Sequence, residues 1–277
     1  TGVGNVAVGY GTMGESTSNA ITGDDNIAIG YAAGYNLEGA AHSNVLIGKN
    51  AGHVMTTGVS TVAIGINTLA ALTSGASNTA VGYTAGTAIT TGERNTILGY
   101  EALDGGSTEV DDNTAIGFRA MTGAIGTEAV NDCVAIGSYA LYGALEEEAS
   151  GTIAIGVTAL GALTSGTGNT VVGYQSAPEL TTGNNNTAIG YQALLNADGG
   201  EADCTAVGYQ AGTTIDGNGT CTVIGKSANP SAAGTDNETV IGAGVTGQAA
   251  NSVTLGNANV TAVYMAQDSG ATVHCAG

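Results

Sequence analysis

The sequence is short of proline, aromatic residues and charge. Its 277 residues include two Pro, one Phe and no Trp, and only 10% are charged. So little Pro excludes collagen-like and Pro-rich disordered chains, and so little charge is not typical of a disordered polyelectrolyte. Few aromatic side chains are available to fill the thick core of a large globular enzyme. We therefore expect many thin, similar layers.

Basic residues are the scarcest charged group. Four Lys and Arg face 23 Asp and Glu, which gives a net charge of −19. Both nucleic-acid binding and attachment to an anionic bilayer depend on Lys and Arg, so neither partner is expected. No apolar run approaches the ~20 residues of a membrane-spanning helix, so membrane insertion is not expected. The chain begins at Thr1 rather than Met, and we interpret it as a processed product or a piece of a longer chain.

Glycine, by contrast, is abundant, and it marks an internal repeat. A five-residue core such as 113–117 (Asn-Thr-Ala-Ile-Gly) recurs fifteen times, mostly at steps of 17 or 18 residues. The cores end at glycines 9, 30, 48, 65, 82, 99, 117, 137, 156, 173, 190, 208, 225, 242 and 256. Self-similarity on this scale indicates a solenoid rather than two domains. We predict a repeat shaft over 1–256 and a C-terminal cap or joint over 257–277.

Each unit has a period of two. In the core 113–117, Thr114 and Ile116 share one face and Ala115 takes the other, as in a strand. A second short piece follows the glycine, usually with Ala at its third position, and turn residues complete the unit. We therefore predict an all-β fold: a parallel β-roll or β-solenoid of about fifteen two-strand coils. The glycine is expected at a corner, with a backbone conformation that residues with a Cβ do not adopt.

A coil of this kind has a narrow interior that buries little apolar surface. Such burial does not comfortably offset the entropy lost when the chain is ordered. We therefore expect three chains to share a common axis and to bury an apolar face against one another, so that the fold is homotrimeric.

The repeat resembles a known family. Residues 251–256 (Asn-Ser-Val-Thr-Leu-Gly) and 26–30 (Asn-Ile-Ala-Ile-Gly) are similar to the NSVAIG-type repeat of YadA-like trimeric autotransporter adhesin heads. Similar repeats occur in bacteriophage tail fibres. The resemblance implies a left-handed parallel β-roll, one roll per chain and three chains per head. The adhesin unit is shorter, and only the last step here, of 14 residues, matches it.

Three cysteines share one column of the repeat. Cys133, Cys204 and Cys221 lie four residues before a core glycine, where most units have Asn. Cys204 and Cys221 fall in consecutive coils, so their Cα atoms are expected within the roughly 4.4–6.8 Å that a disulfide spans. A disulfide and two small buried thiols both remain open. No CxxC spacing predicts a zinc site.

Aromatic residues form a second column, directly after the core glycine. Its members are Tyr10, Tyr31, Tyr83, Tyr100, Phe118, Tyr174, Tyr191 and Tyr209. The candidate ligand strip consists of Tyr83, Tyr100, Tyr174, Tyr191 and Tyr209, which would bind carbohydrate or another fibre. The alternative is structural, since stacked Tyr shield a core while their hydroxyl groups stay in water.

Acidic residues concentrate in the loops, and three are candidate Ca²⁺ ligands: Asp111, Asp112 and Asp216. The alternative is a solvated surface that prevents clumping by charge repulsion. No other cofactor is expected. The GxGxxG at 242–247 contains a corner glycine and precedes another strand rather than a helix, so it offers no dinucleotide site. The loop histidines His42 and His53 are expected at the surface, outside any catalytic triad.

These features predict a non-enzymatic fibre or adhesin in the extracellular space, on a cell surface or on a virion. Its role is to project and attach to a glycan or protein of a host surface. One alternative is an ice-binding β-solenoid, which needs paired Thr on a flat face. Another is a phage-borne polysaccharide depolymerase, which needs a pair of carboxylates fixed on strands.

Overall fold

The computed structural model describes residues 2–14, 21–105, 110–123, 130–146, 149–217 and 219–263. Within them, fifteen short strands form one parallel sheet in chain order. Their bounds are β1 Val6–Val8, β2 Ile27–Ile29, β3 Val45–Ile47, β4 Val62–Ile64, β5 Thr79–Val81, β6 Thr96–Leu98, β7 Thr114–Ile116, β8 Val134–Ile136, β9 Ile153–Ile155, β10 Thr170–Val172, β11 Thr187–Ile189, β12 Thr205–Val207, β13 Cys221–Ile224, β14 Glu238–Ile241 and β15 Val253–Leu255.

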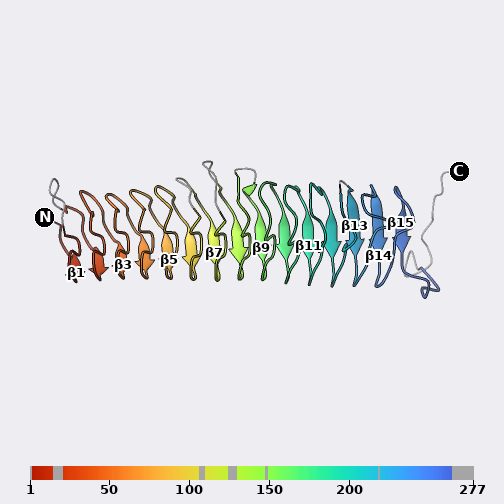
Figure 1. Cartoon of the computed structure of the whole chain (residues 1–277), viewed down its shortest axis with the longest axis horizontal. Helices are drawn as coiled ribbons and strands as arrows, with labels where there is room; N and C mark the ends of the chain where they lie inside the picture. The colour runs from red at the N-terminus through yellow and green to blue at the C-terminus, as the bar shows by residue number, and fades with distance from the viewer. Residues whose placement is uncertain are drawn as a thin grey trace, which may run out of the picture.

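The strands stack into a rod. Figure 1 shows their arrows side by side along the long axis, all pointing the same way. Each core pairs with the same core of the next coil, as where Thr114 faces Val134 and Ile116 faces Ile136. The predicted all-β parallel solenoid is therefore confirmed. In the part of the chain that the structure describes, no helix is long and apolar enough to cross a membrane.

Each coil holds one strand, so the prediction of two was wrong. After the corner glycine the backbone alternates in φ sign: Gln192 (φ 54°) and Leu194 (φ 52°) are left-handed. Gln192 N donates to Tyr174 O of the preceding coil (2.9 Å), and Leu194 N donates to Ala211 O of the following one (3.0 Å). This segment therefore bonds to both neighbours without becoming extended.

The corner glycines adopt a conformation that side chains exclude, as predicted. Gly208 has a φ of 138°, and a Cβ on it would lie 2.6 Å from the carbonyl oxygen of Gly225 in the next coil. The other corners also have a positive φ, of 134–148° except at Gly256 (81°), which explains why glycine is the fixed element of the repeat.

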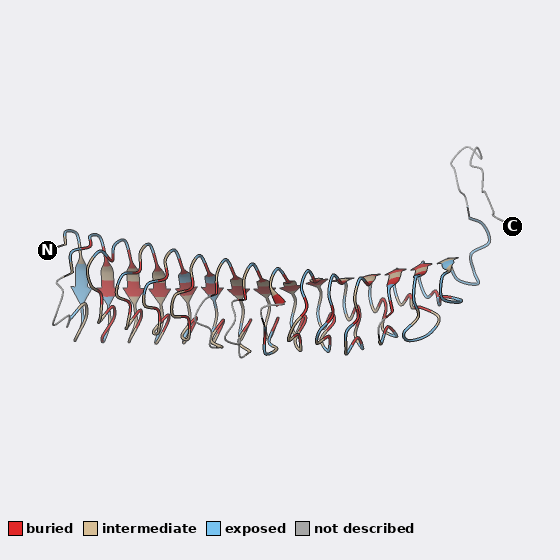
Figure 2. Ribbon diagram, turned by 90° about the horizontal axis from the view of Figure 1, so that it is seen from above, coloured by how far each residue is buried: buried red, intermediate tan, exposed pale blue. Residues whose placement is uncertain are grey.

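The interior of the rod is filled by small side chains from two sides. The middle residue of a strand, such as Ala115, and the third residue after the corner, such as Ala120, are fully buried. Larger side chains on the return segment, among them Met55 and Leu103, fill the remaining space. In Figure 2 the buried colour accordingly continues from the strands into the return segments.

In the three-residue strands, the branched residues at the first and third positions lie on the outer face of the sheet; in the four-residue strands β13 and β14, the second and fourth residues do. In β7, Thr114 and Ile116 are only half-buried, whereas Ala115 between them is fully buried. The pattern recurs along the rod, so the sheet presents a continuous outer face of Val, Ile, Leu and Thr, which we call the outer sheet face. Of the predicted C-terminal segment, residues 257–263 contain no strand, and Cys275 lies outside the described residues.

Candidate functional site

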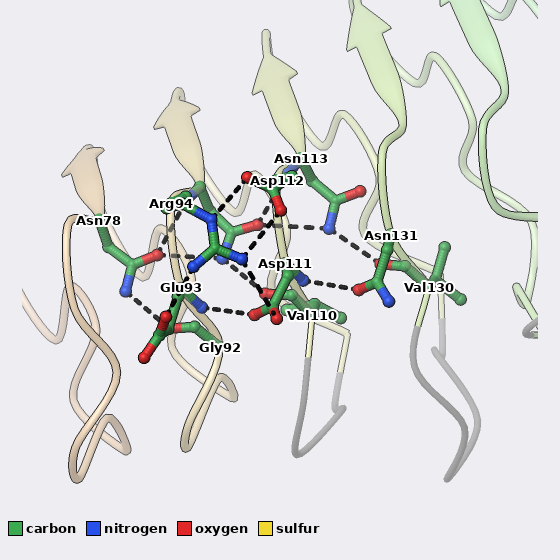
Figure 3. A network of polar contacts seen from close by, with 11 residues as sticks. Asn78, Gly92, Glu93, Arg94, Val110, Asp111, Asp112, Asn113, Val130 and Asn131 are labelled. Atoms are coloured by element: carbon green, nitrogen blue, oxygen red, sulfur yellow. Dashed lines mark hydrogen bonds and ion pairs between the residues drawn. The ribbon is translucent and has the colours of Figure 1, made fainter.

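A ladder of buried asparagines joins the strands to their loops. Asn95 Nδ2 donates to Asn78 Oδ1 (3.0 Å) and to the loop carbonyl of Val110 (2.7 Å). Asn113 Nδ2 donates in the same way to Asn95 Oδ1. The side chains of Asn78, Asn95 and Asn113 are almost fully buried (Figure 3). Each carboxamide thus satisfies a buried loop carbonyl and holds that loop at a fixed place beside the strand.

Two of the predicted calcium ligands instead face an arginine. Arg94 Nε donates to Asp112 Oδ1 (2.8 Å), and its Nη2 lies 3.6 Å from Asp111 Oδ2 (Figure 3). The hydrogen bond from Arg94 holds the pKa of the Asp112 carboxyl below its usual range. Asp111 also accepts a hydrogen bond from the backbone N of Glu93 (2.7 Å). These carboxylates therefore already have a cationic partner, which a bound Ca²⁺ would have to displace.

The third candidate, Asp216, lies with two other acids. Carboxylate oxygens of Asp198, Glu201 and Asp216 lie within 4.8 Å of one another. Glu201 is fully buried, and its two oxygens accept hydrogen bonds from the backbone N of Gly199 (3.1 Å) and Gly217 (2.8 Å). Carboxylate oxygens are the ligand type that Ca²⁺ prefers. Calcium binding at Asp216 stays a prediction.

The three cysteines of the Asn column are buried free thiols. Each donates to a carbonyl on the next coil: Cys133 to Ala149 (3.3 Å), Cys204 to Gly219 (2.9 Å) and Cys221 to Thr235 (3.0 Å). Burial raises the pKa of Cys133 and of Cys204 to about 11, and it also raises the pKa of Cys221. Each thiol therefore makes the bond to a loop carbonyl that the Asn Nδ2 makes in other coils. The disulfide between Cys204 and Cys221 stays a prediction.

The predicted aromatic strip forms two stacked runs. Tyr83, Tyr100 and Phe118 stack at centroid distances of 5.1 and 5.3 Å. Tyr174, Tyr191 and Tyr209 stack at 5.4 and 5.1 Å. Rings that stack in this way cover each other's faces, so the strip presents mainly ring edges and hydroxyl groups to solvent.

Polar side chains reinforce both runs. Gln175, Gln192 and Gln210, each next to a Tyr of the second run, are joined by amide hydrogen bonds of 3.0 and 2.9 Å. In the first run, a hydrogen bond to Glu101 raises the pKa of Tyr100. Glu101 also accepts a hydrogen bond from Arg119 Nε (2.6 Å). The predicted strip is therefore an ordered surface.

The outer sheet face carries a ladder of threonines. Thr170, Thr187, Thr205, Thr222 and Thr239 are register partners on five consecutive strands. The residue two positions after each of these threonines is Val or Ile and points to the same face. The face is therefore a regular array of hydroxyl and methyl groups.

Two features were missed. Tyr35 stacks on His53 at 5.2 Å, so His53 is part of an aromatic pair rather than a plain loop residue. Glu238 occupies the Asn column and is almost fully buried; its Oε2 accepts from Ser231 N and Oγ (3.0 Å each), and its Oε1 has no partner. It is also the only acid in the described strands, so the strand-borne carboxylate pair of a depolymerase is not found there.

Comparison with known proteins gave no match to a family model, a curated protein or a solved structure.

Proposed function

We propose that this chain is the shaft of a homotrimeric surface fibre, with a left-handed β-roll in each chain, that projects from a virion or cell and attaches to a host surface. The observation that carries the proposal is the outer sheet face, which runs over fifteen in-register strands and leaves residues such as Leu98 and Ile189 exposed. An apolar surface of that extent is typical of a protein interface.

Further copies of the same chain can cover the outer sheet face when they assemble around a common axis. Three rods around a common axis each direct the outer sheet face inward, so no copy leaves an apolar face in water. The acidic loops then remain outside, where the net charge of −19 keeps separate fibres apart. The resemblance to trimeric adhesin heads favours three copies over two.

Sedimentation velocity and electron microscopy of the purified chain test this proposal. We expect a rod-shaped particle with three times the chain mass of 26.8 kDa. Ile136→Glu places a charge in the middle of the outer sheet face and is expected to dissociate the particle. Thr57→Glu, on an exposed return segment, is the matched control and leaves it intact. A parent chain that stays monomeric, with a β-rich circular dichroism spectrum, contradicts the assembly.

The threonine ladder favours ice binding as a second candidate function. Thr187 and Ile189 alternate on one strand and repeat on the neighbouring strands, so the outer sheet face orders hydroxyl and methyl groups at a fixed spacing. This use requires the face to be open to water, whereas the fibre requires it to be covered. A thermal hysteresis measurement on the purified chain decides between them: freezing-point depression without an equal melting shift supports ice binding.

A further inference from the structure

Neighbouring coils of the rod carry stacked pairs of phenol rings. Tyr83 lies on Tyr100 with the ring centroids 5.1 Å apart and the ring planes 10° apart. Tyr191 lies between Tyr174 and Tyr209 with interplanar angles of 9° and 7°. All five side chains leave the same position of the repeat, directly after a corner glycine, so the rings of a pair project side by side. The ortho carbons of one phenol therefore lie about one strand spacing from those of the next.

The rings of the first pair are close together and also accessible. The backbone holds the pair in register, because the N of Glu101 donates to the carbonyl oxygen of Tyr83 (2.9 Å). Tyr83 and Tyr100 are nevertheless 45% and 43% exposed. Stacking covers the ring faces, so the exposed part consists mainly of ring edges, which carry the hydroxyl group and the ortho carbons. An oxidant in solution can therefore reach both phenols.

A carboxylate beside this pair is placed to accept a phenol proton. Glu101 takes a hydrogen bond from Tyr100, and this bond raises the pKa of Tyr100 and lowers the pKa of Glu101. Glu101 also accepts from Arg119 Nε (2.6 Å), which favours its ionised form. A phenol that loses an electron becomes a strong acid, and a base within hydrogen-bond reach takes up its proton directly. Tyr100 is therefore prepared for oxidation by its neighbour.

The other face of Tyr100 stacks on Phe118, which has no hydroxyl group and forms no phenoxyl radical. The stack thus pairs Tyr100 with Tyr83. We propose that Tyr83 and Tyr100 are a site of oxidative cross-linking, at which hydrogen peroxide and a haem peroxidase join the two phenols into dityrosine. The inference goes beyond the proposed function and does not rest on it, since both rings belong to one chain.

The reaction balances with hydrogen peroxide as the oxidant. Each phenol loses one electron and its hydroxyl proton, and the two electrons and two protons reduce one hydrogen peroxide to two waters. The two radicals then form a carbon–carbon bond between their ortho carbons. The hydrogen atoms on those carbons move to the phenol oxygens, which restores both aromatic rings. The product joins two consecutive coils of the rod by a covalent bond.

Peroxidase treatment of the full chain followed by tryptic peptide mapping tests the proposal. Arg94 lies between the two tyrosines, so trypsin separates peptide 50–94, which contains Tyr83, from peptide 95–119, which contains Tyr100. After treatment with peroxidase and hydrogen peroxide, we expect these two peptides to be joined. The mass of the product should equal their sum less two hydrogen atoms, and the product should show dityrosine fluorescence.

Three variants assign the cross-link to its residues. Tyr83→Phe keeps an aromatic ring in a column that already accepts Phe118, and it should abolish the linked peptide pair. Tyr191→Phe, in the second run, is the matched control and should leave the pair unchanged. Glu101→Gln introduces the residue that follows the Tyr in three other coils, and without the carboxylate the cross-link should form severalfold more slowly.

The outcomes separate this proposal from the fibre itself. An oxidised parent chain without the linked pair overturns the site, as does a pair that persists in Tyr83→Phe. Cross-linking mainly between chains, seen as bands above 26.8 kDa on a denaturing gel, also overturns it. An unchanged rate in Glu101→Gln contradicts the role given to that carboxylate. A linked pair within a chain that sediments as a monomer supports the site and contradicts the proposed assembly.

Discussion

At the scale of single residues, the chain contains two kinds of amide ladder. Asn95 belongs to the interior ladder and makes bonds to Asn78 and Asn113 as well as to a loop carbonyl. Asn50 belongs to an outer one, where its side chain donates to Asn67 Oδ1 (3.0 Å). The two ladders use the same side chain, but only the interior one is shielded from water.

This difference predicts unequal costs of removal. Asn95→Ala leaves the buried Val110 carbonyl and the backbone N of Asn113 without partners, so we expect the free energy of unfolding to fall by about 2–4 kcal/mol. Asn50→Gly, which keeps the left-handed φ of 56° without strain and lets water replace the lost partner, is expected to cost under about 1 kcal/mol. Urea unfolding followed by circular dichroism measures both. Similar costs for the two variants would show that the interior ladder is not effectively dehydrated.

Cys133 predicts a loss of stability at high pH. Its pKa is raised by burial from 9.0 to about 11, so the folded chain keeps a proton that the unfolded chain loses. The contribution of this thiol is fully present below about pH 9 and is lost as the pH rises toward about 11. The expected loss is about 2–3 kcal/mol.

Cys133→Ala isolates that effect, since tyrosine and lysine also titrate in the same range. The difference in unfolding free energy between the parent chain and Cys133→Ala should shrink from about pH 8 to about pH 11. Urea unfolding at several pH values measures it. A difference that stays constant with pH would mean that the thiol is not protected from ionisation.

At the scale of the repeat element, the corner is the part that tolerates least change. Gly208→Ala forces a Cβ against the Gly225 carbonyl and requires a φ of 138° from an L-residue, so we expect a loss of at least about 3 kcal/mol. Gly199→Ala is the control, because a Cβ there has no atom within 4 Å; it should change stability by less than about 1 kcal/mol. Thermal unfolding compares the two, and a well-folded Gly208→Ala variant would contradict the proposed role of the corner.

The repeat also shows what a sequence pattern determines. The strands could be predicted because branched residues and Ala alternate before every glycine. The segment after the glycine could not be assigned, because alternation of inward and outward side chains is common to an extended strand and to a backbone whose φ alternates in sign, as at Gln192 and Leu194.

The candidate sites could likewise be predicted only in part. The Tyr column could be predicted, since it keeps a constant distance from the glycine. The contacts of Arg94 with Asp111 and Asp112 depend on how loops of different length align, which the spacing of the glycines does not specify. The stacking of Tyr35 on His53 was missed because the fifth position after the corner glycine is aromatic in only three of the fifteen coils: Tyr35, His53 and Tyr142.

At the scale of the whole molecule, each coil contacts its neighbours and little else, so whole coils should be removable. Deletion of residues 157–173 joins Gly156 to Tyr174 and keeps every column in register. We expect a folded rod shorter by one rung, about 4.8 Å. Small-angle scattering and circular dichroism measure the length and the fold.

Deletion of residues 157–164 is the matched control, because it shortens one step from 17 residues to 9, so that coil can no longer pass around the rod and pair in register. It is expected to lose cooperative unfolding. If both deletions were equally harmful, stability would depend on contacts beyond neighbouring coils.

The thiol at Cys133 has a mechanical consequence for a rod built in this way. A sulfur stands there where Asn113, one rung earlier, presents an oxygen that accepts from the next backbone N. Backbone bonds still cross from β8 to β9, and Cys133 Sγ still donates to Ala149 O, but no side-chain oxygen at this position accepts from the next backbone N. If such a rod were anchored at one end and pulled at the other, we would expect it to extend first at steps that lack this bond.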